Sequence, residues 1–309
     1  MIHLDHATKL YGQVIGVNDM TASLAWGGYG LLGPNGSGKS TLLNLITGQL
    51  RPTLGSVRVL DSNPASQPQV LRRIGYCPEQ DMLYSNVTSL EWVRYMVRLH
   101  GFSARQASQQ AEQALEQVGM AQAMRRPMGG YSRGMRQRTK LAQAIAHGPD
   151  LLILDEPLNG LDPVGRHEIT VLLQQWIRAG KGLILASHIL HEVSAVTQAF
   201  LLICNGRLLA SGSTEEVQTL LADIPDEIRI RCDRGPVLAR RLVEEDVVES
   251  VRLGADGTLA VGTRSPAKVY AGLPGWIEET GVQVSELRSS EDSLQLLFAS
   301  LLRIHRGKA

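Results

Sequence analysis

A glycine-rich stretch combines a lysine with hydroxyl side chains at a fixed spacing. Its residues are Gly33, Pro34, Asn35, Gly36, Ser37, Gly38, Lys39, Ser40 and Thr41. Glycines allow positive φ angles, so successive backbone N–H groups can point at one anion, and Lys39 and the Ser40 hydroxyl can add a phosphate contact and a Mg²⁺ ligand. An apolar run ends at Leu32 and helical spacing starts at Leu42, which favours this interpretation over a structural glycine turn. The sequence therefore predicts a nucleoside triphosphate and Mg²⁺ as ligands.

Two carboxylates follow a second apolar run. Residues 151–154 are all aliphatic, and Asp155 and Glu156 come directly after them. A buried parallel strand places its last residues at the edge of the sheet where α/β folds bind ligands. Asp155 could hold Mg²⁺ or its water there, and Glu156 could orient and deprotonate an attacking water. A solvated acidic turn is the alternative for this pair alone, and the preceding glycine-rich loop favours the catalytic interpretation.

A turn that contains serine and glycine opens another predicted helix, at Tyr131-Ser132-Arg133-Gly134. A hydroxyl, a glycine N–H and a helix N-terminus together can bind an anion. Taken alone, however, such a turn is more typical of an ordinary capped helix.

The order of five segments is more specific than any one of them. GPNGSGKST, YSRGMRQR, LLILDEP, NGLDP and ASHILHEV follow one another as they do in ABC-transporter nucleotide-binding domains, which residues 1 to about 220 resemble. The resemblance implies two copies that face each other head to tail with two ATP molecules between them. It also implies that Ser132 and Gly134 contact the ATP held by the glycine-rich loop of the other copy.

The resemblance implies roles for three residues whose local pattern is not decisive. Tyr11 matches the aromatic residue that stacks on adenine, with a packed surface tyrosine as the alternative. His188 matches the histidine that contacts the γ-phosphate, whereas a lone histidine would more commonly belong to a core. Asp162, in the segment 159–162, matches the loop that touches the opposite site.

The sequence departs from the family pattern at three places. Arg133 stands where glycine is common, and Met135 stands where glutamine is common. After residues 74–78, the glutamine position of the family aligns with Glu79, and Gln80 comes one residue later. One of these two is expected to sense the attacking water and Mg²⁺, and Glu79 is the candidate for a direct metal ligand.

The composition is that of a globular protein with balanced charge. The 309 residues include 31 basic and 30 acidic side chains, a net charge of +1, so we expect no nucleic acid as a partner. Three widely spaced cysteines favour a reducing compartment over a disulfide framework or a zinc site. Because the N-terminus lacks a signal-peptide pattern and no apolar run is long enough to cross a membrane, we expect a cytoplasmic protein.

Alternating strand and helix patterns predict an α/β fold over residues 1–222, and the family resemblance implies that this part is a P-loop ABC-type ATPase domain. Short alternating runs in residues 1–32 indicate strands, with Tyr11 and Gly12 in a turn. Helical spacing from 88 to 125 indicates a helical subdomain at about 85–135. The remaining predicted elements are strands at 57–60, 73–77, 151–154, 183–187 and 200–203, and helices near 136–147, 163–179 and 189–197.

Beyond Asp223-Ile224-Pro225 the pattern predicts a second domain, residues 223–309. Its expected elements are strand 227–231, helix 236–244, strands 247–253 and 258–262, helix 265–280, strand 282–288 and helix 291–305. This order suits a small α+β domain of ferredoxin-like type followed by a helix. The part as a whole resembles the extension on exporter ATPase subunits whose membrane domain is a separate polypeptide, and residues 293–298 resemble its closing helix.

The resemblance therefore implies an ATP-hydrolysing motor subunit of an ABC transporter, with export favoured by the C-terminal part. Its partners would be a second copy and a separate transmembrane permease, docked in a groove beside residues 79 to 100 and holding the chain at the inner face of the membrane. The alternative is a soluble ABC ATPase that acts on a ribosome or on DNA. A single set of motifs without coiled coils or zinc cysteines disfavours that alternative.

Overall fold

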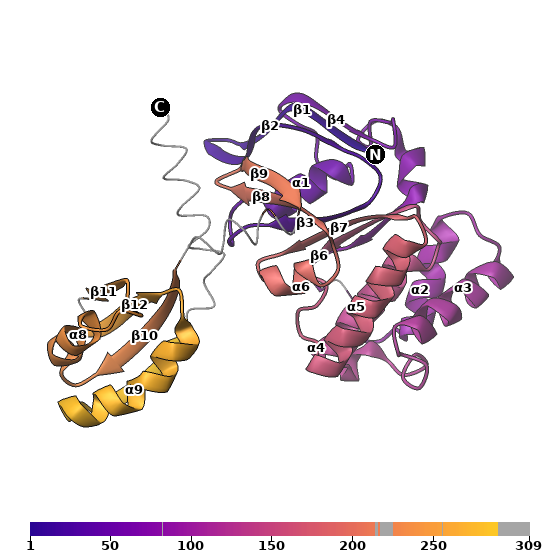
Figure 1. The fold of residues 1–309 in the computed structure, drawn as a ribbon. Helices are drawn as coiled ribbons and strands as arrows, with labels where there is room; N and C mark the ends of the chain where they lie inside the picture. The colour runs from indigo at the N-terminus through magenta and orange to yellow at the C-terminus, as the bar shows by residue number, and fades with distance from the viewer. Residues whose placement is uncertain (82, 214–215, 217–224, 255, 290–309) are drawn as a thin grey trace. The chain divides into compact units, whose positions relative to one another are not determined.

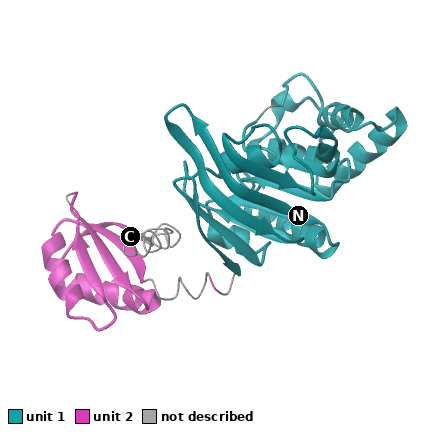
Figure 2. Ribbon diagram, turned by 90° about the horizontal axis from the view of Figure 1, so that it is seen from above, with its two compact units in different colours: residues 1–214 teal, residues 215–309 magenta. Residues whose placement is uncertain are grey.

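The computed structural model describes residues 1–81, 83–213, 216, 225–254 and 256–289. The chain divides into two compact units, residues 1–214 and 215–309 (Figure 2). Each unit has its own buried apolar core. The boundary expected at residues 222 and 223 lies outside the described residues.

The first unit contains a three-stranded antiparallel sheet in the order β2-β1-β4. Its strands are β1 (Ile2–Tyr11), β2 (Val14–Leu24) and β4 (Leu54–Val59). Ile2 and Leu4 are buried whereas His3 between them is exposed, which is the alternation of a sheet covered on one face. The chain turns between β1 and β2 beside Tyr11, as predicted, and Gly12 has the positive φ that this tight turn requires.

A six-stranded sheet with the order β5-β6-β7-β3-β8-β9 forms the centre of the first unit. Its strands are β3 (Gly28–Leu32), β5 (Ile74–Cys77), β6 (Leu151–Asp155), β7 (Gly182–Ser187), β8 (Ala199–Cys204) and β9 (Arg207–Ser213). All neighbours pair in parallel except β8 and β9. The two strands β6 and β7 are buried along their whole length, as expected where helices or another sheet cover both faces.

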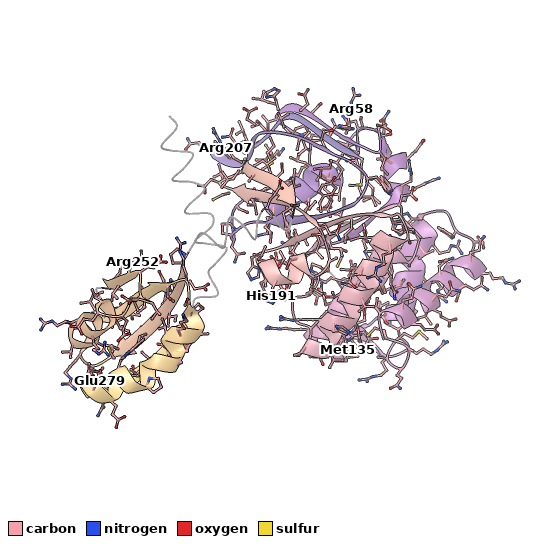
Figure 3. All side chains as sticks on the ribbon, viewed as in Figure 1. Arg58, Met135, His191, Arg207, Arg252 and Glu279 are labelled. Atoms are coloured by element: carbon pink, nitrogen blue, oxygen red, sulfur yellow. The ribbon has the colours of Figure 1, made fainter. Side chains whose placement is uncertain are left out.

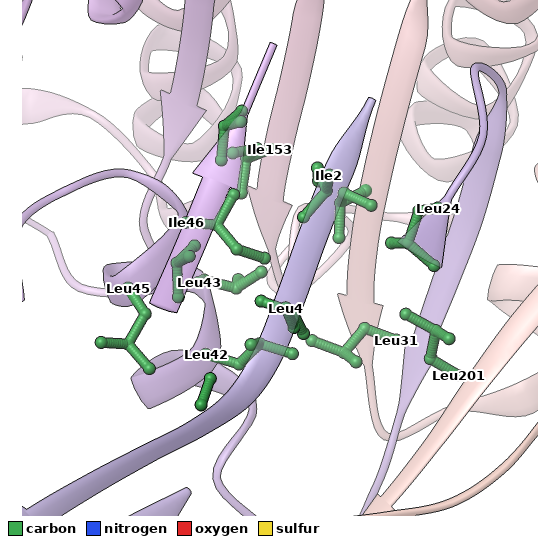
Figure 4. Packing of buried hydrophobic residues seen from close by; sticks show 14 of the residues in the cluster. Ile2, Leu4, Leu24, Leu31, Leu42, Leu43, Leu45, Ile46, Ile153 and Leu201 are labelled. Atoms are coloured by element: carbon green, nitrogen blue, oxygen red, sulfur yellow. The ribbon is translucent and has the colours of Figure 1, made fainter. Parts of the chain in front are cut away.

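Helix α1 (Lys39–Ile46) packs between the two sheets. Figure 4 shows Leu43 and Ile46 of this helix close to Ile2 of β1 and Ile153 of β6. Helices α5 (Pro163–Arg178) and α6 (Leu190–Ser194) lie on the other side of the six-stranded sheet (Figure 1). The apolar residues of α1 therefore fix the start of the helix, and with it the glycine-rich loop, against the sheet.

The helical subdomain consists of α2 (Ser89–Leu99) and α3 (Ala104–Gln117), which pack with α4 (Arg133–Ile145). Capping boxes begin both of its helices: Thr88 with Glu91, and Ser103 with Gln106. Short 3₁₀ helices, η1 (Pro68–Arg73) and η2 (Met128–Gly130), connect the neighbouring elements. Among the helices that the structure describes, none has the length and apolar character needed to cross a membrane.

The second unit has the element order predicted from the sequence. Its elements are β10 (Asp226–Cys232), α8 (Gly235–Val243), β11 (Ser250–Leu253), β12 (Thr258–Thr263), α9 (Pro266–Thr280) and β13 (Val284–Ser289). The strands pair antiparallel in the order β11-β12-β10-β13, the arrangement of a ferredoxin-like sheet. Ion pairs of this unit join Arg252 to Glu227 and Glu279 to Arg241. Figure 3 labels Arg252 and Glu279. The helix predicted at 291–305 lies outside the described residues.

Two histidines stack where the helical subdomain meets the central sheet. His100 caps the C-terminal end of α2 and His147 follows α4, and their ring centroids are 3.8 Å apart. The Nε2 atom of His147 lies 3.1 Å from the carbonyl oxygen of Ile74 in β5. Burial, together with a smaller effect of the neighbouring His100, lowers the pKa of His147 to about 4. Folding therefore favours the neutral form of His147.

This burial predicts an acid-sensitive fold. An unfolded histidine titrates near pH 6.5, so between about pH 6.5 and pH 4 the unfolded chain binds more protons than the folded chain. The free energy of unfolding is therefore undiminished above this window and falls as the pH drops through it. The free energy of unfolding should fall between pH 7 and pH 5 by about 2 kcal/mol less in His147→Gln than in the wild type. Denaturant unfolding at both pH values measures this difference.

His167→Gln is the matched control because His167 is exposed on α5. It should keep the pH dependence of the wild-type protein. The same slope in His147→Gln as in the wild type would show that His147 does not carry the acid sensitivity.

Candidate functional site

The glycine-rich loop connects β3 to α1, as the sequence predicts. Gly36 and Gly38 have φ angles of 76° and 104°, which other residues rarely adopt. Gly38 also precedes the first residue of α1, and a Cβ atom there would lie 2.3 Å from the carbonyl oxygen of Gly16. Both positions therefore require glycine, one for its conformation and the other for conformation and space.

Lys39 lies at the centre of this loop with only 7% of its surface exposed. Its Nζ atom donates hydrogen bonds to the carbonyl oxygens of Gly33 (2.7 Å) and Pro34 (3.3 Å). Burial lowers the pKa of Lys39, and the carboxylates of Glu156, Asp155 and Glu79 oppose that shift. Among the described residues the partners of this buried cation are backbone carbonyls, and such a cation is suited to exchange them for an anionic ligand.

Ser40 and Asp155 form the metal-binding candidate. The Ser40 hydroxyl donates a hydrogen bond of 2.8 Å to Oδ2 of Asp155, and the other oxygen, Oδ1, is buried without a partner among the described residues. Burial raises the pKa of Asp155, which the Ser40 hydrogen bond opposes and Glu79 reinforces. A hydroxyl beside a carboxylate oxygen without a partner suits Mg²⁺, which usually takes one or two protein ligands together with phosphate oxygens.

Glu156 is buried, with 5% of its surface exposed, and two side chains orient its carboxylate. The Ser187 hydroxyl donates to Oε2 at 3.1 Å, and Nδ1 of His188 lies 2.9 Å from Oε1. Because β6 and β7 pair in parallel, the ends of both strands meet at this edge. The φ angle of Glu156 is 50°, a conformation that glutamate rarely adopts outside functional sites.

Gln137 of α4 supports Glu156 from the backbone side. Its Nε2 atom donates to the carbonyl oxygen of Pro157 at 2.9 Å and to that of Glu156 at 3.4 Å. Gln137 has 6% of its surface exposed, so these bonds are shielded from water. The turn that carries Glu156 is thus attached to α4.

A cleft of about 420 Å³ begins at this site and extends toward the helical subdomain. Its lining residues are Ser40, Asn44, Gln49, Ile74, Tyr76, Pro78, Glu79, Gln80, Met96, His100, Gln143, Ala144, His147 and Asp155. Glu79 and Gln80 are therefore in the same cleft as the metal-binding candidate. Glu79 also acts electrostatically on Asp155 and Lys39, which supports the expectation that Glu79 faces the metal.

Tyr11 stands beside the glycine-rich loop. Its hydroxyl is 3.5 Å from Oγ1 of Thr41, and 45% of its surface is exposed. A Cβ atom on Gly16 would lie 2.7 Å from the Tyr11 ring, so glycine at this position leaves room for the ring. An exposed ring at the edge of a phosphate site is suited to stack on a base.

Ser132 and Asp162 have local partners in the single copy. Ser132 accepts a hydrogen bond of 3.2 Å from the backbone N–H of Met135 and caps α4, whose start is marked by Met135 in Figure 3. Asp162 accepts one of 2.9 Å from Gly165 and caps α5. A Cβ atom on Gly134 would lie 3.1 Å from the carbonyl oxygen of Gly160. Within the described residues, no hydrogen bond joins these caps to the glycine-rich loop.

Sequence reasoning missed several residues that support the site. They are Arg136, Gln137, Lys140 and Ser187. Two of them could have been recognised from the sequence. Gln137 and Lys140 are polar residues three apart on the face of α4 that is otherwise mostly apolar and buried. A polar residue on the buried face of a helix requires an internal hydrogen-bond partner, and both of these have one.

Known proteins are similar to this chain in sequence. A family model described as ABC transporter matches residues 18–159. YxlF of Bacillus subtilis (strain 168), an uncharacterized ABC transporter ATP-binding protein, is 37% identical over 188 residues, which are 61% of this chain and 62% of YxlF. The bacitracin transport ATP-binding protein BcrA of Enterococcus faecalis is 34% identical over 305 residues, 98% of this chain and 96% of BcrA. The match thus spans less than two thirds of YxlF but nearly all of BcrA.

A solved structure has the same fold. It is the dimeric structure of a post-hydrolysis state of the ATP-binding cassette MJ0796 bound to ADP and Pi. The TM-score is 0.65 at 23% identity, over 69% of this chain and 98% of the cassette. The likeness shows that the fold is that of an ATP-binding cassette.

Proposed function

The chain belongs to the family of ABC transporter ATP-binding proteins, and we propose that it hydrolyses ATP to drive an exporter whose membrane-spanning part is a separate polypeptide. One observation carries the ATPase assignment. Lys39, the Ser40–Asp155 pair and Glu156 converge at one edge of the six-stranded sheet. Their chemistry is complementary: a cation for phosphates, oxygen ligands for Mg²⁺ and a carboxylate for the attacking water.

The residues would act as follows. Backbone N–H groups of the loop and Lys39 would bind the phosphates, and Ser40 and Asp155 would hold Mg²⁺, which when bound would supply positive charge beside the phosphates. Glu156 accepts a proton from the water whose oxygen attacks the γ-phosphorus, and ADP leaves on the opposite side. His188 holds the Glu156 carboxylate at 2.9 Å and is half exposed, so it can also reach the γ-phosphate.

A second copy of the chain would complete the site. Ser132 and Gly134 lie at the N-terminus of α4, where a hydroxyl and free backbone N–H groups favour an anion. Among the described residues, no hydrogen bond joins this turn to the glycine-rich loop of the same copy. A phosphate bound by that loop would therefore have no contact with the turn of its own copy. A head-to-tail dimer would place the nucleotide of one copy against the turn of the other. This proposal agrees with the dimeric state of the MJ0796 cassette.

The membrane partner would dock on α2 beside the cleft. Tyr84, Tyr95 and Leu99 are exposed by 65%, 57% and 63%, although apolar side chains of this size usually pack. Met96 and His100 of the same helix line the cleft that leads to Glu79 and Asp155. A cytoplasmic segment of the permease that covers this surface would therefore sense the metal site. A role in transport is supported by the match to the bacitracin transport protein BcrA, which extends over nearly the whole chain and includes the second unit. Export is preferred to import because the C-terminal part resembles the extension on exporter ATPase subunits.

Glu156→Gln tests the proposed base. The amide keeps the size and most of the hydrogen bonding of Glu156 but cannot accept a proton. ATP hydrolysis should fall by roughly 10²–10⁴-fold while ATP binding persists. The ATP-bound dimer should accumulate and elute early from a sizing column. Turnover equal to that of the wild type would reject Glu156 as the base.

Ser132→Arg tests the dimer. A bulky cation at the turn should block the approach of the second copy, so ATP should no longer induce dimers. The affinity of the monomer for ATP, measured by calorimetry, should stay within about twofold because Ser132 lies outside the monomer's own loop. An equal loss of monomer affinity would instead place Ser132 in the site of its own chain.

Leu99→Glu tests the transport function. The tagged full chain is purified from membranes of its own cells, and the co-purifying protein is identified by mass spectrometry. A multi-span membrane protein should be recovered, and Leu99→Glu should reduce its recovery by about tenfold or more because a buried charge is costly. Leu54→Glu is the matched control: Leu54 is also 63% exposed but lies on β4. Recovery of ribosomes or DNA in place of a membrane protein would overturn the exporter proposal.

A further inference from the structure

One turn of α4 holds the segment 78–81 that carries Glu79 and Gln80. The Nζ atom of Lys140 donates to three consecutive carbonyl oxygens: Pro78 at 2.8 Å, Glu79 at 2.7 Å and Gln80 at 3.5 Å. Lys140 is 5% exposed, so these bonds are formed away from water. An ammonium group has three donors, and here each has a carbonyl partner.

Arg136 holds the next residue of the same segment. Its guanidinium donates to Oδ2 of Asp81 at 3.0 Å and to the carbonyl oxygen of Met128 at 3.1 Å. Residues 136 and 140 are four apart and therefore lie on one face of the helix. Arg136 and Lys140 together attach four successive residues, 78–81, to α4.

The backbone contacts determine where the side chains of Glu79 and Gln80 can point. Fixing three consecutive carbonyl groups restricts the φ and ψ angles between them, and these angles aim the two exposed side chains into the cleft. A buried lysine without these acceptors would be strongly unfavourable, so the attachment is held by the desolvation of the charge itself. The segment 78–80 is thus held in one position against α4.

The N-terminal end of α4 carries the turn proposed to contact the nucleotide of the second copy. Ser132 caps the helix, and Arg136 and Lys140 follow one and two turns later. A helix moves as a rigid element because its backbone hydrogen bonds are internal. A displacement of the Ser132 turn is therefore transferred along α4 to residues 78–81.

We propose that Lys140, assisted by Arg136, is a positioning residue that attaches the Glu79–Gln80 segment to α4 and so couples this segment to the Ser132 turn. The proposal rests on the proposed role of Glu79 or Gln80 at the metal and the attacking water. Among the described residues, the hydrogen bonds of Lys140 all go to the backbone carbonyls of this segment. It acts through the backbone that it holds.

Lys140→Met in the full chain tests the attachment. Methionine has a similar length but no donor, so the segment should open more often. Deuterium exchange of peptides within 76–84, measured on the nucleotide-free protein, should become faster by about tenfold or more. Lys140→Arg should restore much of the protection. Lys181→Met is the matched control, because Lys181 also donates to a backbone carbonyl, that of Pro149, outside this segment.

Kinetics test whether the attachment matters for turnover. Lys140→Met should lower kcat by about ten- to a hundredfold, since misplacement of a positioning group has this scale of effect. Its ATP affinity without Mg²⁺ should stay within about twofold of wild type, which a general folding defect would not allow. Combined with Glu79→Ala or Gln80→Ala, whichever single change is the more severe, Lys140→Met should cause little additional loss.

Several results would overturn the proposal. They are unchanged exchange in residues 76–84, losses that multiply in the double variant, or wild-type turnover in both Glu79→Ala and Gln80→Ala. If Lys140→Met does not fold, Asp81→Ala removes the acceptor of the Arg136 hydrogen bond and should still speed the exchange. A chain that hydrolyses no ATP would refute the proposed function, whereas the exchange experiment would still decide whether Lys140 holds the segment.

Discussion

The parallel pairing of β6, β7 and β3 is the constraint on which the site depends. In this register Asp155 lies opposite Ala186, and Leu32 lies opposite Ser187. The last residues of the three strands therefore end at one edge, followed by the glycine-rich loop on one strand and by Glu156 and His188 on the others. A slip of one residue would turn each side chain to the opposite face of the sheet. The apolar residues that fix the register thus also fix the chemistry.

The same edge gathers buried charge, which costs stability. Burial lowers the pKa of Lys39 and raises that of Asp155, so burial disfavours the charged form of both side chains when no ligand is bound. Glu156 adds a left-handed backbone conformation. Such local conflicts persist only where the surrounding fold determines them, here through Gln137 and the buried strands. A triphosphate with Mg²⁺ would relieve the conflict by supplying the missing opposite charges.

Much of this arrangement could be predicted from residue patterns. The glycine-rich loop and the pair Asp155–Glu156 stand where an apolar run breaks, so both the element and its end were recognisable. Strand β9 was missed because Arg207–Ser213 is a half-exposed edge strand without clear alternation. The partners of Lys140 were not predictable, because backbone carbonyls have no side-chain signature. Their adjacent positions also left the roles of Glu79 and Gln80 open. Both line the same cleft, where the charge of Glu79 influences the pKa values of Asp155 and Lys39.

Helix α4 connects parts of the site that lie far apart in the chain. Gln137 holds the backbone of the turn that carries Glu156, and Lys140 holds the segment with Glu79. Both lie within three turns of the Ser132 cap. One rigid element therefore sets the positions of the Glu156 turn, which carries the proposed base, and of the segment 78–81, which carries the proposed metal sensor. The start of that element is the proposed contact with the second copy. In such a dimer, the geometry of each copy's site would depend on the position of the other copy. Such a dependence would be a physical basis for hydrolysis that occurs only in the closed dimer.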